Sequence, residues 1–489
     1  MPKLLTESAV LGILTNYAST VINYGLAVVY IILLTKYVPL TQYGYYNAMI
    51  ALISAISLFF PTLGIDNAIA REAAVTHSSG GDVTPYYSAM FSLSFTLTLG
   101  YVAAMIASIP VFIKDGIPGW LMGIIYIQAA STLIQSLANV MGFHLWATGK
   151  VASQGLGLVL GNLAYRISEV ALIIVTRSVY AIAVSVLLNS VVTLMYYLSR
   201  VKALPGLTLG YRVLKARVKS FLNFGFQFWL ATYLGSAFSN LVAYLVFKIL
   251  GPNYSGIYGI TYTALGLLTS FSTAVSGVFG SLAAHGLGVN VELRGLSRDY
   301  AQASLAIAGL LSMIAVLFAP LLPMLHIFNG NYAEAVPYLM LFAGIAPLSA
   351  IDGVYMMYYW VSGKGWLAVE RTLAGAAANV ALFVLLASRL GLYAAVLSAY
   401  AGAAITMILY WVNNRPWGFK MGATSVLSVL LPALSASLFV VSDPVLKWPI
   451  PQLILLVAFT LIMVVIKPVE KSVIEDSPKF LKIILKAFT

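Results

Sequence analysis

Two residues of opposite charge stand inside an otherwise apolar stretch, Asn162-Leu-Ala-Tyr-Arg-Ile-Ser-Glu-Val-Ala-Leu-Ile-Ile-Val175. Arg166 and Glu169 are three positions apart, so a helix places both on one face. A charge within a membrane span costs roughly 2.5–3.5 kcal/mol to insert, and each one therefore needs a partner or a function. Two hypotheses follow. Arg166 is a cation for a substrate phosphate, held by Glu169, or the two residues are a self-neutralised pair that packs their helix.

A second group of charges closes the stretch Leu63-Gly-Ile-Asp-Asn-Ala-Ile-Ala-Arg-Glu72. Arg71 is either a cation that meets an anionic head entering from the cytoplasm or an interfacial arginine that extends to the headgroups. Asp66, Glu72 and, in the second half of the chain, Asp352 are candidates for ion coupling. We expect no bound cofactor and no metal site; the energy would come from H⁺, Na⁺ or the membrane potential.

Several of these residues belong to a repeat. The segment Lys36–Glu72 resembles Lys248–Ala284 at a shift of 212 residues, which places Lys36 on Lys248 and Tyr46 on Tyr258. The two lysines are either a cationic rim for the substrate phosphate or interface anchors. Tyr46, Tyr258 and Asn47 are candidate contacts for sugar rings and hydroxyls, although aromatic residues also form interfacial belts.

A second pair of motifs supports a duplication. Leu145-Trp-Ala-Thr-Gly-Lys150 matches Tyr359-Trp-Val-Ser-Gly-Lys364 at a shift of 214 residues. Two motif pairs in the same order at nearly one offset predict two homologous lobes. An even number of spans within the repeat makes these lobes parallel, related by an axis along the membrane normal.

The composition identifies the environment of these elements. The chain has 489 residues, of which 61% are hydrophobic and 9% are charged, whereas soluble domains carry roughly 25% charged residues. Repeated apolar runs of about 20 residues predict an all-α polytopic membrane protein. The absence of cysteine excludes disulfides and thiolate metal sites. No pattern of catalytic, metal-binding or ATP-binding residues is evident, so we predict that the protein is not an enzyme.

Fourteen spans are expected, in two six-helix lobes followed by a helix pair. The second span is expected at about 44–72, the tenth at 335–361 and the last two at 422–441 and 449–466. Of the 27 lysines and arginines, 20 fall on one side of this topology and 6 on the other, which predicts cytoplasmic termini. The predicted divisions are a lobe at 1–199, a basic connector at 200–219, a lobe at 220–415, the helix pair at 416–466 and an amphipathic tail at 467–489.

The charge of +12 thus reflects topology rather than a nucleic-acid partner. Within the connector, Tyr211–Ser220 is expected as a short helix on anionic headgroups.

With its duplicated turns, the Leu63–Glu72 segment and the two Gly-Lys turns, the chain resembles flippases of the multidrug/oligosaccharidyl-lipid/polysaccharide exporter superfamily, and most of all its Wzx-type polysaccharide branch. The resemblance covers residues 5–415 as lobes and 422–466 as the extra pair. It implies a MATE-like fold that moves a polyprenyl-(pyro)phosphate-linked oligosaccharide to the outer leaflet of the cell membrane by alternating access. Its implied partners are the lipid-linked oligosaccharide, membrane lipids and polysaccharide-assembly enzymes, with the monomer as the working unit.

Two other functions stay open. One is an H⁺- or Na⁺-coupled multidrug exporter of the same superfamily, against which stand the extra helix pair and the cationic candidate residues. The other is a polytopic glycosyltransferase or polymerase, which would commonly carry a large extramembrane loop with catalytic carboxylates. The longest loop expected here is the twenty-residue basic connector.

Overall fold

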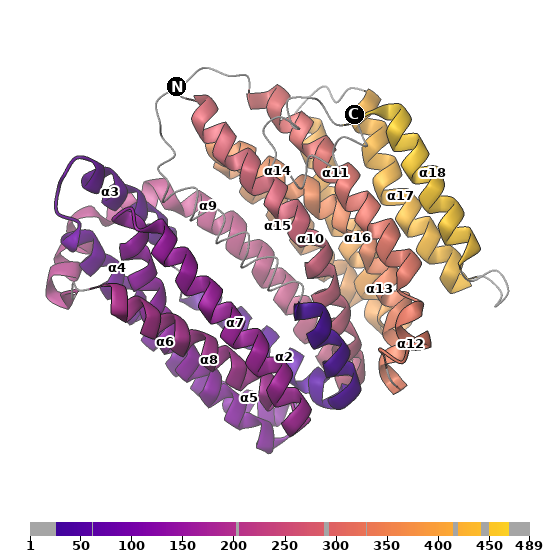
Figure 1. The fold of residues 1–489 in the computed structure, drawn as a ribbon, viewed down its shortest axis with the longest axis horizontal. Helices are drawn as coiled ribbons and strands as arrows, with labels where there is room; N and C mark the ends of the chain where they lie inside the picture. Colours follow the sequence, from indigo (N-terminus) through magenta and orange to yellow (C-terminus); the bar gives the residue numbers. More distant parts are fainter. Residues whose placement is uncertain are drawn as a thin grey trace. The chain divides into compact units, whose positions relative to one another are not determined.

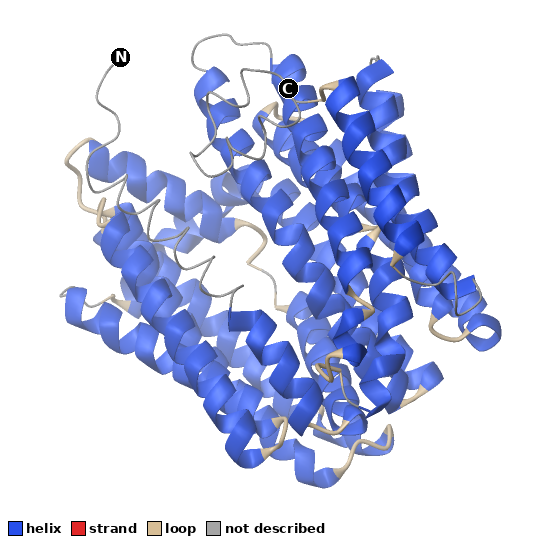
Figure 2. Cartoon of the chain, turned by 45° about the vertical axis from the view of Figure 1, so that its right-hand side comes forward, coloured by secondary structure: helices blue, strands red, loops and turns tan. Residues whose placement is uncertain are grey.

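The structure, a computed structural model, describes residues 26–60, 62–201, 205–287, 293–328, 330–413, 419–441 and 449–468. Within these ranges the chain consists of helices joined by turns, without strands, which confirms the all-α prediction (Figure 2). Its contacts divide it into two compact units, residues 1–233 and 234–489. Most of the predicted first span and of the amphipathic tail lies outside the described residues.

Unit 1 is the N-terminal half, coloured from indigo to magenta in Figure 1. After an unlabelled helix at Leu26–Tyr37, its elements are α2 Leu40–Ile56, η1 Ser57–Phe59, α3 Ile65–Ser78, α4 Thr84–Ala107, α5 Ile109–Lys114, η2 Gly119–Met122, α6 Gly123–Ala147, α7 Val151–Thr176, α8 Tyr180–Arg200 and the first half of α9 Leu207–Leu250. In this unit α7 packs along α8, and α6 packs against both α8 and α4.

Unit 2 contains the rest of α9 and the helices that follow it (Figure 1). They are α10 Pro252–Leu287, α11 Leu293–Phe318, α12 Leu321–Met324, η3 Gly330–Glu334, α13 Ala335–Ala343, α14 Ala346–Val361, α15 Gly365–Leu390, α16 Tyr393–Asn413, α17 Phe419–Val441 and α18 Ile450–Ile466. The predicted extra pair is present as α17 and α18, which pack on each other and on α11.

The helices suit a membrane. Among the described residues, nine helices are long and apolar enough to cross it, or ten if α13 and α14, bent by 45°, form one span. This makes the chain a multi-pass membrane protein, while the predicted count of fourteen spans is not confirmed.

The predicted second span, 44–72, is wrong as a continuous helix. It is broken between α2 and α3, where Leu63 and Gly64 have φ of 53° and 74°. The sequence gives a reason, because Pro61 carries no amide hydrogen and disfavours helical geometry in the residue before it. In the second repeat the position of Pro61 is Thr273, and α10 runs through it without a break.

The predicted surface helix at 211–220 belongs to a longer element. It is part of α9, which continues into the next span as one helix of 44 residues. The start of α9 is docked on α4: the Gly206 amide donates to Ser88 Oγ at 3.0 Å, and Ser92 Oγ donates to the Leu207 carbonyl at 3.0 Å. These bonds anchor the connector to protein as well as to any headgroups.

The repeated Gly-Lys turns have the same backbone geometry. Gly149 and Gly363 both have left-handed φ, 74° and 71°. In each turn the lysine amide donates to the carbonyl five residues earlier, at 2.8 Å for Lys150 and 2.7 Å for Lys364. This is a helix end of the Schellman type, in which glycine takes the left-handed position without strain. The agreement supports the duplication inferred from the sequence.

A repeated helix contact accompanies the turns. In unit 1, Gly161 of α7 lies directly against Thr193 of α8, and in unit 2, Gly375 of α15 lies directly against Thr406 of α16. A methyl group at either glycine would overlap the threonine hydroxyl. Small residues allow this close approach, which is a common basis of helix association in membranes.

We therefore expect Gly161→Ala and Gly375→Ala to destabilise the protein to a similar extent, by about 1–3 kcal/mol each, because both overpack an equivalent contact. Thermal unfolding of the purified protein in detergent measures the loss. Gly119→Ala is the control, since a methyl group there meets nothing within 4 Å. A loss at one of the two sites alone would show that the helix pairs are not equivalent.

Candidate functional site

Unit 1 contains a cavity of about 600 Å³ beside the break between α2 and α3. Side chains from the break, α4, α6, α8 and α9 line it, and most of them are polar but uncharged. The polar ones are Ser57, Thr62, Asp66, Ser94, Thr98, Tyr101, Gln128, Ser131, Thr132, Gln135, Ser136, Asn139, Asn189, Ser190 and Tyr233. Asp66 is the one acidic side chain in this lining, and no lysine or arginine of the described residues contributes to it.

Four oxygen atoms of the lining are buried without a hydrogen-bond partner among the described residues. They are Thr62 Oγ1, Asp66 Oδ1, Gln128 Oε1 and Ser131 Oγ. An unsatisfied buried polar atom costs about 1–3 kcal/mol, so such atoms call for water or a ligand. Two of them come from the break, whose unwound backbone leads directly into the cavity wall. The arrangement is suited to a ligand rich in hydroxyl groups.

Arg166 and Glu169 lie outside this cavity lining and are bonded to each other. Arg166 Nη1 donates to Glu169 Oε2 at 2.6 Å, and the glutamate side chain is fully buried. The guanidinium also lies over the rings of Tyr165 at 4.6 Å and Tyr30 at 5.6 Å. Tyr46, another predicted site residue, is close enough to Glu169 to interact with it electrostatically. This geometry favours the hypothesis of a self-neutralised pair.

At the end of α3, Glu72 has a partner on another helix. It accepts a hydrogen bond from Arg217 of α9, which also donates to Tyr86 Oη at 2.8 Å. Its neighbour Glu72 raises the pKa of the Arg217 guanidinium above its ordinary value. The pair holds the connector part of α9 against α3 and α4. The side chain of Arg71 is outside the described residues.

The remaining predicted residues are scattered. Lys36 is exposed, with its ammonium 5.5 Å from the Tyr37 ring, and Lys248 is exposed in the last turn of α9. Tyr258 is buried, stacked on Tyr262 with centroids 5.6 Å apart. Asn47 is partly buried on α2. None of these residues, among those described, lines the unit 1 cavity.

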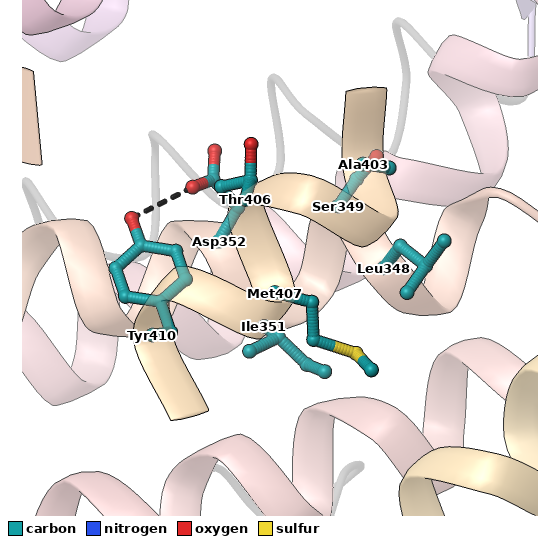
Figure 3. A pocket seen from close by; sticks show the side chains of 8 residues that line it. All are labelled: Leu348, Ser349, Ile351, Asp352, Ala403, Thr406, Met407 and Tyr410. Carbon is teal, nitrogen blue, oxygen red and sulfur yellow. Dashed lines mark hydrogen bonds between the residues drawn. The ribbon is translucent and has the colours of Figure 1, made fainter. Parts of the chain in front are cut away.

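Asp352 lies in unit 2, beside a cavity of about 90 Å³ (Figure 3). Its Oδ1 accepts a hydrogen bond of 2.8 Å from Tyr410 of α16. Ser349 and Thr406 face the same cavity. Asp352 is thus held by a neutral donor, in a small space that water can occupy.

Arg371 of α15 is a residue that sequence reasoning missed. It was counted with the cytoplasmic charges, yet its side chain is 1% exposed. The guanidinium lies 4.1 Å from the Tyr359 centroid and 4.9 Å from that of Tyr410. One signal was present in the sequence: Asp352, Tyr355 and Tyr359 follow helical spacing and give α14 a polar, aromatic face.

Solved structures share this fold. An inward closed structure of the lipid II flippase MurJ has a TM-score of 0.66 at 12% identity, covering 91% of this chain and 97% of that one. An inward-facing multidrug resistance MATE family transporter of the MOP superfamily has a TM-score of 0.62 at 17% identity, covering 82% and 94%. A MOP superfamily transporter from Pyrococcus furiosus has a TM-score of 0.56 at 16% identity, covering 84% and 96%. At these identities the likeness establishes the fold.

No curated protein matches this chain in sequence. The model of one protein family, described as polysaccharide biosynthesis protein, matches residues 33–337, which is more than half of the chain. Together with the fold, this match confirms the predicted resemblance and indicates a transporter or flippase rather than an enzyme. The chain therefore belongs to the polysaccharide biosynthesis protein family, within the multidrug/oligosaccharidyl-lipid/polysaccharide (MOP) exporter superfamily.

Proposed function

We propose that this protein is a flippase of the cell membrane. It carries a polyprenyl-(pyro)phosphate-linked oligosaccharide from the cytoplasmic to the outer leaflet by alternating access. The observation that carries the proposal is the unit 1 cavity, because its lining provides many neutral hydrogen-bonding groups and one carboxylate. The direction follows from the predicted cytoplasmic termini.

The chemistry of the cavity suits a sugar. A saccharide that leaves water loses hydrogen bonds at every hydroxyl, and the hydroxyl and amide groups of the wall replace them. The four unsatisfied oxygens can accept hydrogen bonds from sugar hydroxyls, while Tyr101 and Tyr233 offer aromatic surface. A volume of about 600 Å³ lies within the roughly 300–1,000 Å³ of ordinary ligand pockets.

The phosphate and the lipid tail are handled elsewhere in this proposal. Arg71, Lys36 and Lys248 are the proposed contacts of the phosphate, and the polyprenyl chain stays in the bilayer. Outward movement of an anionic head across an inside-negative membrane gains about 2.3 kcal/mol per charge per 100 mV. The membrane potential can therefore drive the cycle without obligatory ion coupling.

One observation favours a second candidate, a cation-coupled multidrug exporter. Asp66 has a buried oxygen without a partner and faces the cavity, where it could bind an organic cation or a coupling ion. The rest of the lining argues for the flippase, because neutral amides and hydroxyls add little affinity for an apolar cation.

The proposal predicts that Thr132→Val slows translocation about two- to tenfold, because a methyl group replaces a hydroxyl in the sugar cavity. The assay follows a fluorescent polyprenyl-pyrophosphate oligosaccharide in proteoliposomes. Thr176→Val is a matched control. Each threonine hydroxyl donates at 2.8 Å to the carbonyl four residues earlier, at Gln128 and Leu172 respectively, but Thr176 is exposed at the end of α7.

Equal rates for the two variants would remove the cavity from the proposal. Efflux of organic cations without lipid translocation, abolished by Asp66→Asn, would establish the second candidate instead.

The paired state of Arg166 makes another prediction. Arg166→Gln leaves the buried Glu169 uncompensated and should cost about 3–5 kcal/mol of stability, whereas Arg166→Met with Glu169→Leu should recover most of it. Thermal unfolding in detergent gives the stability, and the flipping assay gives the function. We expect the double variant to translocate lipid. A stable double variant without translocation would show that Arg166 binds the substrate.

A further inference from the structure

Unit 2 contains a buried arginine whose hydrogen-bonding groups have no partner. Nε, Nη1 and Nη2 of Arg371 form no hydrogen bond among the described residues, and the side chain is 1% exposed. The guanidinium lies over two tyrosine rings, those of Tyr359 and Tyr410, which stack at 5.6 Å with an angle of 10°. The rings fix its position and contribute cation–π attraction, but they do not neutralise a full charge.

A carboxylate stands next to this group. Asp352 interacts electrostatically with Arg371, and both contact Tyr410: the hydroxyl donates to the Asp352 carboxylate and the ring lies under the guanidinium (Figure 3). Glu370, the neighbour of Arg371 in sequence, is exposed. Asp352 is therefore the buried carboxylate that can balance the arginine. The two side chains do not touch as an ion pair; the tyrosine connects them.

The surrounding helices add no competing carboxylate. α14, which carries Asp352, packs against α10, α11, α15, α16 and α17. The described side chains of α10 and α17 include no acidic or basic group. On α11, Arg294 and Arg298 act on Tyr355, one turn from Asp352, and Arg298 pairs with Asp299 at 3.3 Å. The charges near Asp352 are thus positive.

The duplication shows that this charge is particular to unit 2. At the repeat offset, Arg371 corresponds to Gly157, and Tyr410 corresponds to Tyr197. In unit 1 the glycine packs directly on the Tyr197 ring, where a methyl group would overlap it. In unit 2 the same position carries a guanidinium over the corresponding tyrosine. Asp352 corresponds to Ala138, so acid and base are both confined to one repeat.

We propose that Arg371 is the built-in counter-cation of Asp352, positioned by the stacked rings of Tyr359 and Tyr410. Asp352 then needs neither Na⁺ nor a proton to be neutralised, and a cation entering the 90 Å³ cavity is repelled by the fixed guanidinium. The consequence for transport, that its rate does not depend on a cation at Asp352, rests on the proposed flippase function. The charge balance itself does not.

The test is a double-mutant cycle on the purified full-length protein, read as melting temperature in detergent, in NaCl and in choline chloride, at pH 6 and pH 8. The wild type should melt at the same temperature in both salts. Arg371→Gln should melt several degrees lower and should recover in NaCl or at pH 6, because Asp352 then takes up a cation through the cavity. Arg371→Gln with Asp352→Asn should melt near the wild type and lose this dependence.

Two further variants keep the test decisive. Arg389→Gln, on the exposed surface of the same helix, is the matched control and should change nothing. If Arg371→Gln does not fold, Asp352→Asn alone should still melt below the wild type, because it leaves the buried guanidinium without its counter-charge.

The proposal fails if the wild type is stabilised by Na⁺ and Asp352→Asn removes that effect, since Asp352 would then be a cation site. It also fails if the double variant melts no higher than Arg371→Gln, since the arginine would then act by packing alone. Lipid translocation by the wild type should be equally fast in both salts. Absence of translocation in every variant would contradict the flippase function and leave the melting cycle valid.

Discussion

The structure depends on one constraint, the cost of placing an unsatisfied polar group in hydrocarbon. It restricts the described chain to helices, which satisfy their own backbone groups. It also explains where the chain departs from regular helix. The break between α2 and α3 frees backbone groups at Leu63 and Gly64, beside a cavity lined by hydroxyls and amides. Irregular backbone at membrane depth is tolerated in such polar surroundings.

The same constraint explains how charges are placed inside the units. Arg166 is bonded to Glu169, Arg217 to Glu72, and Arg371 shares Tyr410 with Asp352. Each buried arginine also lies over at least one tyrosine ring. Tyrosine serves this role because its face attracts the cation and its hydroxyl can bond the counter-charge. The abundance of tyrosine, 30 residues, is therefore partly a consequence of buried arginine.

Periodicity and hydropathy predicted the helices that are uniformly apolar. Spans expected at 422–441 and 449–466 agree closely with α17 and α18. The break at 60–64 was missed because a hydropathy window averages over a single proline and the apolar residues around it. Arg371 was missed for a related reason: near a helix end, a charge in the sequence is indistinguishable from a loop charge. Whether it turns inward depends on Tyr410, 39 residues later.

The candidate site was predicted less well because charge was taken as its main signal. Charged residues in spans mark places where a partner is needed, and here the partners are largely other residues of the chain. Groups that remain unsatisfied, such as Gln128 Oε1 and Ser131 Oγ, are neutral and carry no distinctive sequence pattern. An uncharged side chain can stay without a partner at moderate cost, whereas an uncompensated charge cannot. In a membrane interior, the surface kept open for a neutral sugar is therefore built mainly from the residues that a search for charges overlooks.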